Sequence, residues 1–191
     1  MKTLFLVIST LITVGAVIPY LRDIIKGTTK PNLVSWITWT LITGIATAAE
    51  IAAAEYVTAI FTSAAMLETA SVVALGLRRG YVKYTRFDMA CQLGAVIGVI
   101  LWQIFNSPGV AVVASVTIDL IGVLPTLRHS WHKPHEETWS AYMFSGVGGV
   151  FAIFALSSYN VVSLTYAVYI VLANVVIAFV IVSRRQVFAT R

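Results

Sequence analysis

Seven long apolar stretches, separated by short polar or basic breaks, constrain the fold of this chain more than any other feature. They lie at about residues 3–20, 32–53, 56–77, 88–105, 108–127, 138–157 and 160–183. A helix of about 20 mostly apolar residues crosses the hydrocarbon core of a bilayer, which is about 30 Å thick. The stretches also lack the alternation of apolar and polar residues that marks the strands of a membrane barrel.

Composition indicates the same class of protein. Of the 191 residues, 59% are hydrophobic and only 11% are charged, which leaves too few polar side chains to cover a water-soluble globule. We therefore expect an all-α integral membrane protein with seven transmembrane helices and short loops.

The basic residues are distributed unevenly over the predicted loops. With seven spans, twelve of the thirteen Lys and Arg residues lie on the side of the C-terminus, and only Lys2 lies on the other side. The positive-inside rule then places the N-terminus outside and the C-terminus in the cytoplasm, and we expect the inner membrane of a bacterium. The net charge of +5 follows from this topology and gives no reason to expect a nucleic acid as partner.

One motif occurs twice along the chain. The sequence VIPYLRDIIKGTTKPNLVSWITW at residues 17–39 returns as VLPTLRHSWHKPHEETWSAY at residues 123–142. The matched pairs are Pro19 with Pro125, Arg22 with Arg128, Lys30-Pro31 with Lys133-Pro134, Trp36 with Trp139, and Trp39 with Tyr142. Because the copies begin in the first and fifth predicted helices, both enter the membrane in the same direction.

The repeated motif predicts a 3 + 1 + 3 arrangement of two parallel three-helix bundles. Residues 1–80 form the first unit, 81–106 a linker helix and 107–191 the second unit. Parallel repeats are typical of secondary transporters, in which the substrate site lies near mid-membrane between the repeats. The alternative is an old duplication that is retained only for packing.

The first apolar stretch has a second interpretation as a secretory signal that is cleaved. Lys2 precedes an apolar run that ends in Val14-Gly15-Ala16, which is the order of charge, apolar core and small residues found in such signals. We favour a retained helix, because cleavage would remove the partner that the repeat requires for the fifth helix.

The residues of the motif also carry a resemblance to a known family. A proline near the cytoplasmic end of the first helix of each unit, a short basic loop and an aromatic residue opening the next helix resemble the SWEET and PQ-loop transporter superfamily. This superfamily includes the PnuC vitamin transporters and the KDEL receptor. Where the family has a Pro-Gln pair, this chain has Pro19-Tyr20 and Pro125-Thr126. The resemblance implies alternating access, with transport of a sugar, a vitamin nucleoside or an amino acid.

Pro19 and Pro125 are candidate hinges. A proline inside a helix frees a carbonyl group and weakens the backbone ladder, so the helix bends there at modest cost. The resemblance implies the same role, because the matching prolines of SWEET-like carriers let the cytoplasmic ends of two helices move. The alternative is that each proline simply ends its helix.

Aromatic and hydroxyl side chains are the candidate substrate ligands. Their rings stack on a sugar, nicotinamide or adenine ring, and their N–H and O–H groups add hydrogen bonds. Trp36 and Trp139 are also interpretable as anchors at the bilayer edge. The resemblance to SWEET proteins adds an asparagine of the last helix to the set. The candidate residues are Trp36, Trp39, Thr40, Thr43, Trp139, Tyr142 and Asn174.

Two acids lie in the middle of predicted spans, Glu68 in the third and Asp119 in the fifth. An acid at the bilayer centre costs about 2.5 kcal/mol or more, and no Lys, Arg or His lies at that depth as a partner. A protonatable carboxyl beside a substrate path is what proton coupling requires. The alternative is a protonated acid that bonds a neighbouring helix as packing.

The remaining motifs indicate no enzyme. No nucleophile with its base, no Walker lysine and no cofactor motif occurs, so we expect no cofactor. His129, His132 and His135 could bind a metal together with Glu136 and Glu137, but Pro134 interrupts any helix that would align them. We favour a solvated loop without metal.

Two functions from different classes remain. The first is a secondary transporter of a small polar solute, either a facilitator or coupled to protons. The second is a receptor or sensor of the same fold that binds a ligand or peptide without moving it. A receptor for a peptide end would need a basic residue at depth, so transport is favoured. The expected partners are the substrate and the lipid bilayer, and a homo-oligomer is left open.

Overall fold

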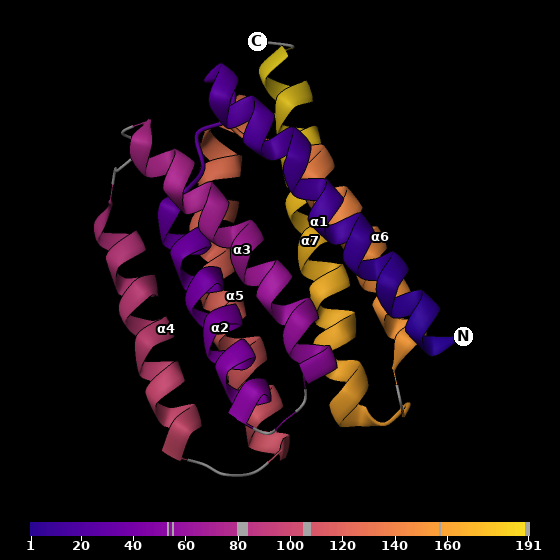
Figure 1. Cartoon of the computed structure of the whole chain (residues 1–191). Helices are drawn as coiled ribbons and strands as arrows, with labels where there is room; N and C mark the ends of the chain where they lie inside the picture. The colour runs from indigo at the N-terminus through magenta and orange to yellow at the C-terminus, as the bar shows by residue number, and fades with distance from the viewer. Residues whose placement is uncertain (53, 55, 80–83, 105–107, 157, 190–191) are drawn as a thin grey trace.

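The computed structural model describes residues 1–52, 54, 56–79, 84–104, 108–156 and 158–189. These residues form seven α-helices and one short 3₁₀ helix, with no strand among them, so the prediction of an all-helical protein is confirmed for the described chain (Figure 1). The elements are α1 (Lys2–Lys26), α2 (Leu33–Ala52), α3 (Tyr56–Arg78), α4 (Arg86–Ile104), α5 (Pro108–His132), η1 (Pro134–Glu136), α6 (Trp139–Ala155) and α7 (Val161–Ala189).

Some sequence predictions fall outside this part of the chain. The predicted unit boundaries at 80/81 and 106/107 lie outside the described residues. The same holds for Lys83 and Arg191, two members of the basic set. The contacts between helices, and not the loops at these boundaries, therefore bear on how the helices are grouped.

Two prolines lie inside helices instead of ending them. α1 continues through Pro19 to Lys26, and α5 continues through Pro125 to His132. Gly27, the residue that follows α1, has a φ of 78°. This left-handed conformation is easy for glycine and common just after a helix. The alternative in which each proline terminates its helix is wrong.

Two of the helices are long and apolar enough to cross a membrane by themselves. Within the described residues they are Lys2–Lys26 and Ser163–Val187, and two shorter apolar helices are Leu33–Ala48 and Trp139–Ala155. This makes a membrane location compatible with the fold.

For the description below, we name two groups of helices: α1, α2 and α3 form the first, and α5, α6 and α7 form the second. α3 packs against both α1 and α2, and α7 packs against both α5 and α6. The two groups meet where α1 packs on α6 and α2 packs on α5. α4 contacts only α2 and α5 and lies at the edge of the bundle (Figure 1).

The contact between α1 and α6 depends on one glycine. A Cβ atom added to Gly148 would collide with Oγ1 of Thr13 and lie 3.2 Å from the carbonyl oxygen of Ser9. A larger residue at position 148 would therefore require the Thr13 side chain or the helices themselves to shift. Small residues commonly allow such close helix packing.

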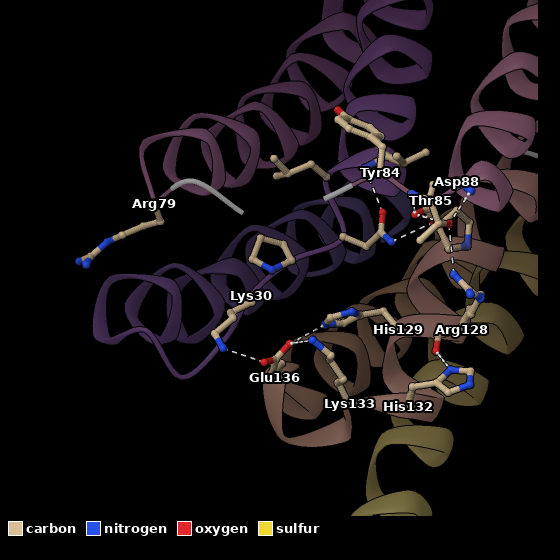
Figure 2. A pocket seen from close by; sticks show the side chains of 15 residues that line it. Lys30, Arg79, Tyr84, Thr85, Asp88, Arg128, His129, His132, Lys133 and Glu136 are labelled. Carbon is tan, nitrogen blue, oxygen red and sulfur yellow. Dashed lines mark hydrogen bonds and ion pairs between the residues drawn. The ribbon is translucent and has the colours of Figure 1, made fainter. Parts of the chain in front are cut away.

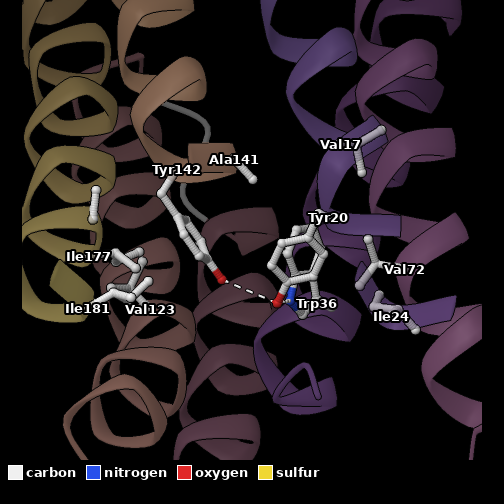
Figure 3. Close-up of a cluster of buried hydrophobic side chains, with 11 residues drawn as sticks. Val17, Tyr20, Ile24, Trp36, Val72, Val123, Ala141, Tyr142, Ile177 and Ile181 are labelled. Carbon is white, nitrogen blue, oxygen red and sulfur yellow. Dashed lines mark hydrogen bonds between the residues drawn. The ribbon is translucent and has the colours of Figure 1, made fainter. Parts of the chain in front are cut away.

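The buried core lies between the two groups, and α4 contributes nothing to it. Its residues include Tyr20, Trp36, Val72, Tyr142 and Ile177, which come from five different helices. Figure 3 shows Tyr20 and Tyr142 pointing toward each other across the bundle.

Candidate functional site

A central cavity of about 280 Å³ lies between the two groups of helices. Helices α1, α2, α3, α5, α6 and α7 all line it, and α4 does not. Five aromatic residues and two acids stand out in the lining, while no Lys, Arg or His among the described residues is part of it. The site therefore combines flat aromatic surfaces with acidic groups: Tyr20, Trp36, Trp39, Tyr142, Tyr166, Glu68 and Asp119.

Most of the residues singled out in the sequence meet at this cavity. The lining contains the following members of the predicted set: Trp36, Trp39, Thr43, Tyr142, Asn174, Glu68 and Asp119. Thr40 is not among the lining residues, and its hydroxyl donates 2.8 Å to the carbonyl oxygen of Trp36 on its own helix. The roles assigned to these residues stay predictions.

The placement expected for Trp139 is wrong. Trp139 does not line the cavity, and 40% of it is exposed. The two residues also differ in their position along the helix: Trp139 is the first residue of α6, whereas its match Trp36 lies three residues after Leu33, the first residue of α2. Tyr142, almost one turn into α6, occupies the buried position instead.

Three aromatic rings form the wall of the cavity near one end. The ring centroids of Tyr20 and Trp36 are 4.8 Å apart, and those of Trp36 and Trp39 are 5.0 Å apart at 85°. The indole Nε1 of Trp36 donates a hydrogen bond of 3.2 Å to the hydroxyl of Tyr20. Edge-to-face packing of this kind holds ring orientations firmly.

The bundle has two distinct ends, and we name one of them the basic end. It is the end at which α1, α3 and α5 finish and at which α2, α4 and α6 begin. The basic end carries Arg22, Lys26, Lys30, Arg78, Arg79, Arg128 and Lys133.

Toward the basic end, a buried carboxyl joins two side chains of the cavity lining that come from different groups of helices, and we name its hydrogen bonds the closing contact. Oε2 of Glu137 accepts 2.7 Å from the hydroxyl of Tyr20 and 3.1 Å from the hydroxyl of Tyr142. The Glu137 side chain is fully buried. Tyr20 comes from α1 and Glu137 from the segment just before α6, so the closing contact joins the two groups of helices.

Sequence reasoning missed this role of Glu137. In the sequence, Glu137 is a candidate only as part of the histidine-rich loop, and Tyr20 only as part of the repeated motif. The contact spans 117 residues of sequence, so no local pattern indicates it. The one available signal was that Tyr20 stands where the family has a glutamine.

The charge on Glu137 is disfavoured by its surroundings. Burial raises the pKa of Glu137 to about 8, and the hydrogen bonds from Tyr20 and Tyr142 oppose this only in part. His129 Nε2 lies 4.0 Å from Oε1 of Glu137, and neither atom has a hydrogen-bond partner within the described chain. Burial also lowers the pKa of His129. Burial therefore disfavours the charged form of both groups.

A second layer of contacts lies outside Glu137. Thr138 Oγ1 donates 2.9 Å to Asp23 Oδ2 and lies 2.6 Å from Oγ1 of Thr29. Lys30 Nζ lies 2.7 Å from Oε1 of Glu136, and the backbone N–H of Lys30 donates 2.8 Å to the carbonyl oxygen of Glu136. The loop after α1 is thus fastened to the segment before α6.

The two mid-helix acids differ in their surroundings. Oδ2 of Asp119 accepts 2.7 Å from the hydroxyl of Tyr169, and the Trp39 side chain is a second hydrogen-bonding neighbour. Glu68 has no hydrogen bond or ion pair within the described residues, although it lines the cavity. Asp119 is held in place, and Glu68 is open to a ligand.

A larger cavity of about 530 Å³ lies outside the closed basic end (Figure 2). His129, Lys30 and Lys133 gather around Glu136 there, whereas Arg79 points away from them. His129 and His132 both line this cavity and His135 does not. Among the described residues, no group of three His, Cys, Asp or Glu side chains is arranged to hold a metal ion.

No protein-family model, curated protein or solved structure matches this chain. The arrangement of its own residues is therefore what indicates its function. The central cavity and the contacts that close it are the features that bear most directly on function.

Proposed function

We propose that this protein is a secondary transporter that moves a small polar solute across a membrane by alternating access. One observation carries the proposal: a central cavity lies between two groups of three helices, and side chains from both groups close it at one end. A transporter needs a site that both halves of the molecule can expose in turn.

We propose that all seven helices span the membrane. Large apolar side chains are exposed on each helix, as expected for surfaces that face lipid: examples are Leu11, Leu41, Ile60, Leu93, Val113, Phe144 and Phe179. Even α6, with 17 residues, is about 26 Å long at about 1.5 Å per residue, close to the thickness of the hydrocarbon core. The basic end then faces the cytoplasm by the positive-inside rule.

The helix contacts support the 3 + 1 + 3 repeat. Exchanging α1 with α5, α2 with α6 and α3 with α7 converts the contact between α1 and α6 into the contact between α5 and α2, and both contacts exist. The same exchange maps the contacts of α3 onto those of α7. α4 has no counterpart and lines no part of the cavity, as expected for a linker helix. This pattern supports membership of the SWEET and PQ-loop superfamily.

The closed basic end corresponds to an outward-facing or occluded state. Opening it requires the ends of α1 and α5 to move away from α6 and α2. Pro19 and Pro125 lie inside those helices at the level of the closing contact, where bending is cheapest. Tyr20, next to Pro19, would leave Glu137 in the same movement.

Uptake into proteoliposomes tests the proposal. The purified chain is reconstituted, and entry of radiolabelled sugars, vitamin nucleosides, amino acids and small organic cations is measured in counterflow with excess unlabelled solute inside. We expect saturable uptake of a member of one class, with no uptake by empty liposomes. Tight binding of a solute that never enters would contradict transport and favour a receptor.

A further inference from the structure

The charges around the central cavity are one-sided. Its lining contains the carboxyl groups of Glu68 and Asp119 and no Lys, Arg or His. A bound anion would therefore meet no opposite charge at a depth where water is scarce, and an unpaired buried charge is costly. A neutral solute can hydrogen-bond to these acids but leaves their negative charge unpaired. A cation is the ligand that this set of charges favours.

Glu68 and Asp119 are not equally available to a ligand. Asp119 already accepts a hydrogen bond from Tyr169 and has Trp39 as a second hydrogen-bonding neighbour. Glu68 lines the cavity with no partner in the part of the chain that the structure describes. A ligand that enters the cavity thus finds one acid with free oxygen atoms.

The walls of the cavity suit a flat cation. Trp36 and Trp39 stand edge to face, and Tyr20 packs on Trp36 with a centroid distance of 4.8 Å. A cation within about 6 Å of an aromatic ring is attracted by about 0.5–2 kcal/mol, and Trp is the strongest partner. The volume of about 280 Å³ lies near the lower limit of about 300–1,000 Å³ found for small-molecule pockets, so the ligand is small.

We propose that the central cavity binds a small organic cation with a flat aromatic ring, and that Glu68 is its counter-ion. Transport of this ligand rests on the proposed function above, whereas its binding does not. The acid, the missing bases and the aromatic wall together define this ligand class.

A proton and the cation then compete for one carboxyl group. Binding the cation requires Glu68 as a carboxylate, so affinity falls as the pH is lowered. The other titratable groups that face the cavity are Asp119 on α5, Tyr20 on α1, Tyr142 on α6 and Tyr166 on α7. α2 contributes none, and Glu68 is the one titratable group of α3 in the described lining. In a transport cycle this competition would exchange one proton for one cation in opposite directions.

Matched probes test the proposal in the purified full-length chain. The cations 1-methylnicotinamide and 1-methylquinolinium are compared with their neutral partners nicotinamide and quinoline, and with the anion nicotinate. Binding is followed by quenching of tryptophan fluorescence and by calorimetry. We expect at least one cation to bind about tenfold or more tightly than its neutral partner, and nicotinate to bind weakest.

Variants of the acid identify the counter-ion. Glu68→Gln should remove most of the preference for the cation and make the remaining binding independent of pH, whereas Glu68→Asp should retain part of both. Thr69→Val is the control, because Thr69 lines the same cavity but its hydroxyl bonds only to its own helix. Thermal unfolding of each variant shows whether it is folded.

Several results would overturn the inference. Equal affinity for cation and neutral partner, absence of binding by both cations, or an unchanged preference in folded Glu68→Gln would each refute it. If the cation binds through Glu68 but does not enter proteoliposomes, transport fails and the binding inference holds. If a neutral solute enters proteoliposomes and neither cation binds, the proposed transport holds and the binding inference fails.

Discussion

Trp36 and Trp139 occupy matching positions in the two copies of the motif, yet Trp36 is 6% exposed and Trp139 is 40% exposed. The prolines of the two copies behave alike, since both lie inside long helices. The two copies thus share the position of the proline inside a helix but differ in the exposure of the matched tryptophans. The repeated motif therefore predicts where a proline lies within its helix better than it predicts which residues line the cavity.

The residues that follow the two prolines differ in the same way. Tyr20 and Thr126 are both fully buried. Tyr20 donates to Glu137, which belongs to the other group of helices, whereas the hydrogen-bonding neighbour of Thr126 is Tyr142, which belongs to its own group. The first half therefore supplies a closing donor and the second half supplies the acceptor, so the two hinges should not be equivalent.

The largest expected effect comes from the two tryptophans. Trp36→Ala should lower transport about a hundredfold or more, because it removes a cavity wall and the donor that orients Tyr20. Trp139→Ala should stay within about twofold of the parent, because an exposed side chain at a helix start contributes little. Initial uptake rates in proteoliposomes measure both. Equal losses of transport in the two variants would contradict the prediction that Trp36 and Trp139 have different roles.

The next effect concerns the closing hydrogen bonds. Tyr20→Phe removes the donor to Glu137 and the acceptor for Trp36, while Tyr142→Phe removes the longer bond to Glu137. Both variants lose the 3.5 Å contact between the two hydroxyls. A hydrogen bond to a carboxyl contributes about 0.5–3 kcal/mol, so Tyr20→Phe should open the basic end about tenfold and Tyr142→Phe less.

Spin labels across the basic end measure this opening. Exposed positions 28 and 135 are suitable, as Thr28→Cys and His135→Cys in a Cys91→Ala background. Pulsed electron resonance should show a longer-distance population that is greater in Tyr20→Phe. A larger opening in Tyr142→Phe would reverse the order that the distances predict.

The same labels test a pH dependence. Burial gives Glu137 a pKa of about 8 in the closed structure, against an ordinary value of 4.5. Between these values the closed form binds the proton more tightly than a form in which Glu137 reaches water. Closure is therefore favoured at low pH and weakens as the pH rises to about 8. Glu137→Gln should keep the basic end closed and flatten this response by several-fold, and an unchanged pH profile would contradict the role of Glu137.

The smallest effect is expected at the hinges. Pro19→Ala and Pro125→Ala should leave folding and ligand binding nearly intact but slow transport several-fold, because they remove freedom to bend rather than contacts. Pro19→Ala should be slower than Pro125→Ala, since Pro19 precedes the closing residue Tyr20. Binding and uptake measured on the same preparations separate the two effects. A parallel loss of binding would show that the prolines are structural.

The sequence predicts the helices well and the closing contact poorly. Long apolar runs determine helices almost by themselves, and of the candidate ligands on α2, Trp36, Trp39 and Thr43 line the cavity whereas Thr40 does not. Two features depend on contacts that are distant in sequence or on where a helix starts. Glu137 meets Tyr20 across 117 residues, and Trp139 is exposed because α6 begins there.

The most direct test of the account is whether one position in the cavity can be reached from both sides of the membrane. Thr43 lines the cavity, so Thr43→Cys in the Cys91→Ala background provides a single thiol at that depth. A membrane-impermeant thiol reagent is added to vesicles of defined orientation, from outside in one preparation and from the cytoplasmic side in the other. Alternating access predicts labelling from either side, each slowed by substrate. Labelling from one side only, under all conditions of pH and substrate, would contradict transport through this cavity.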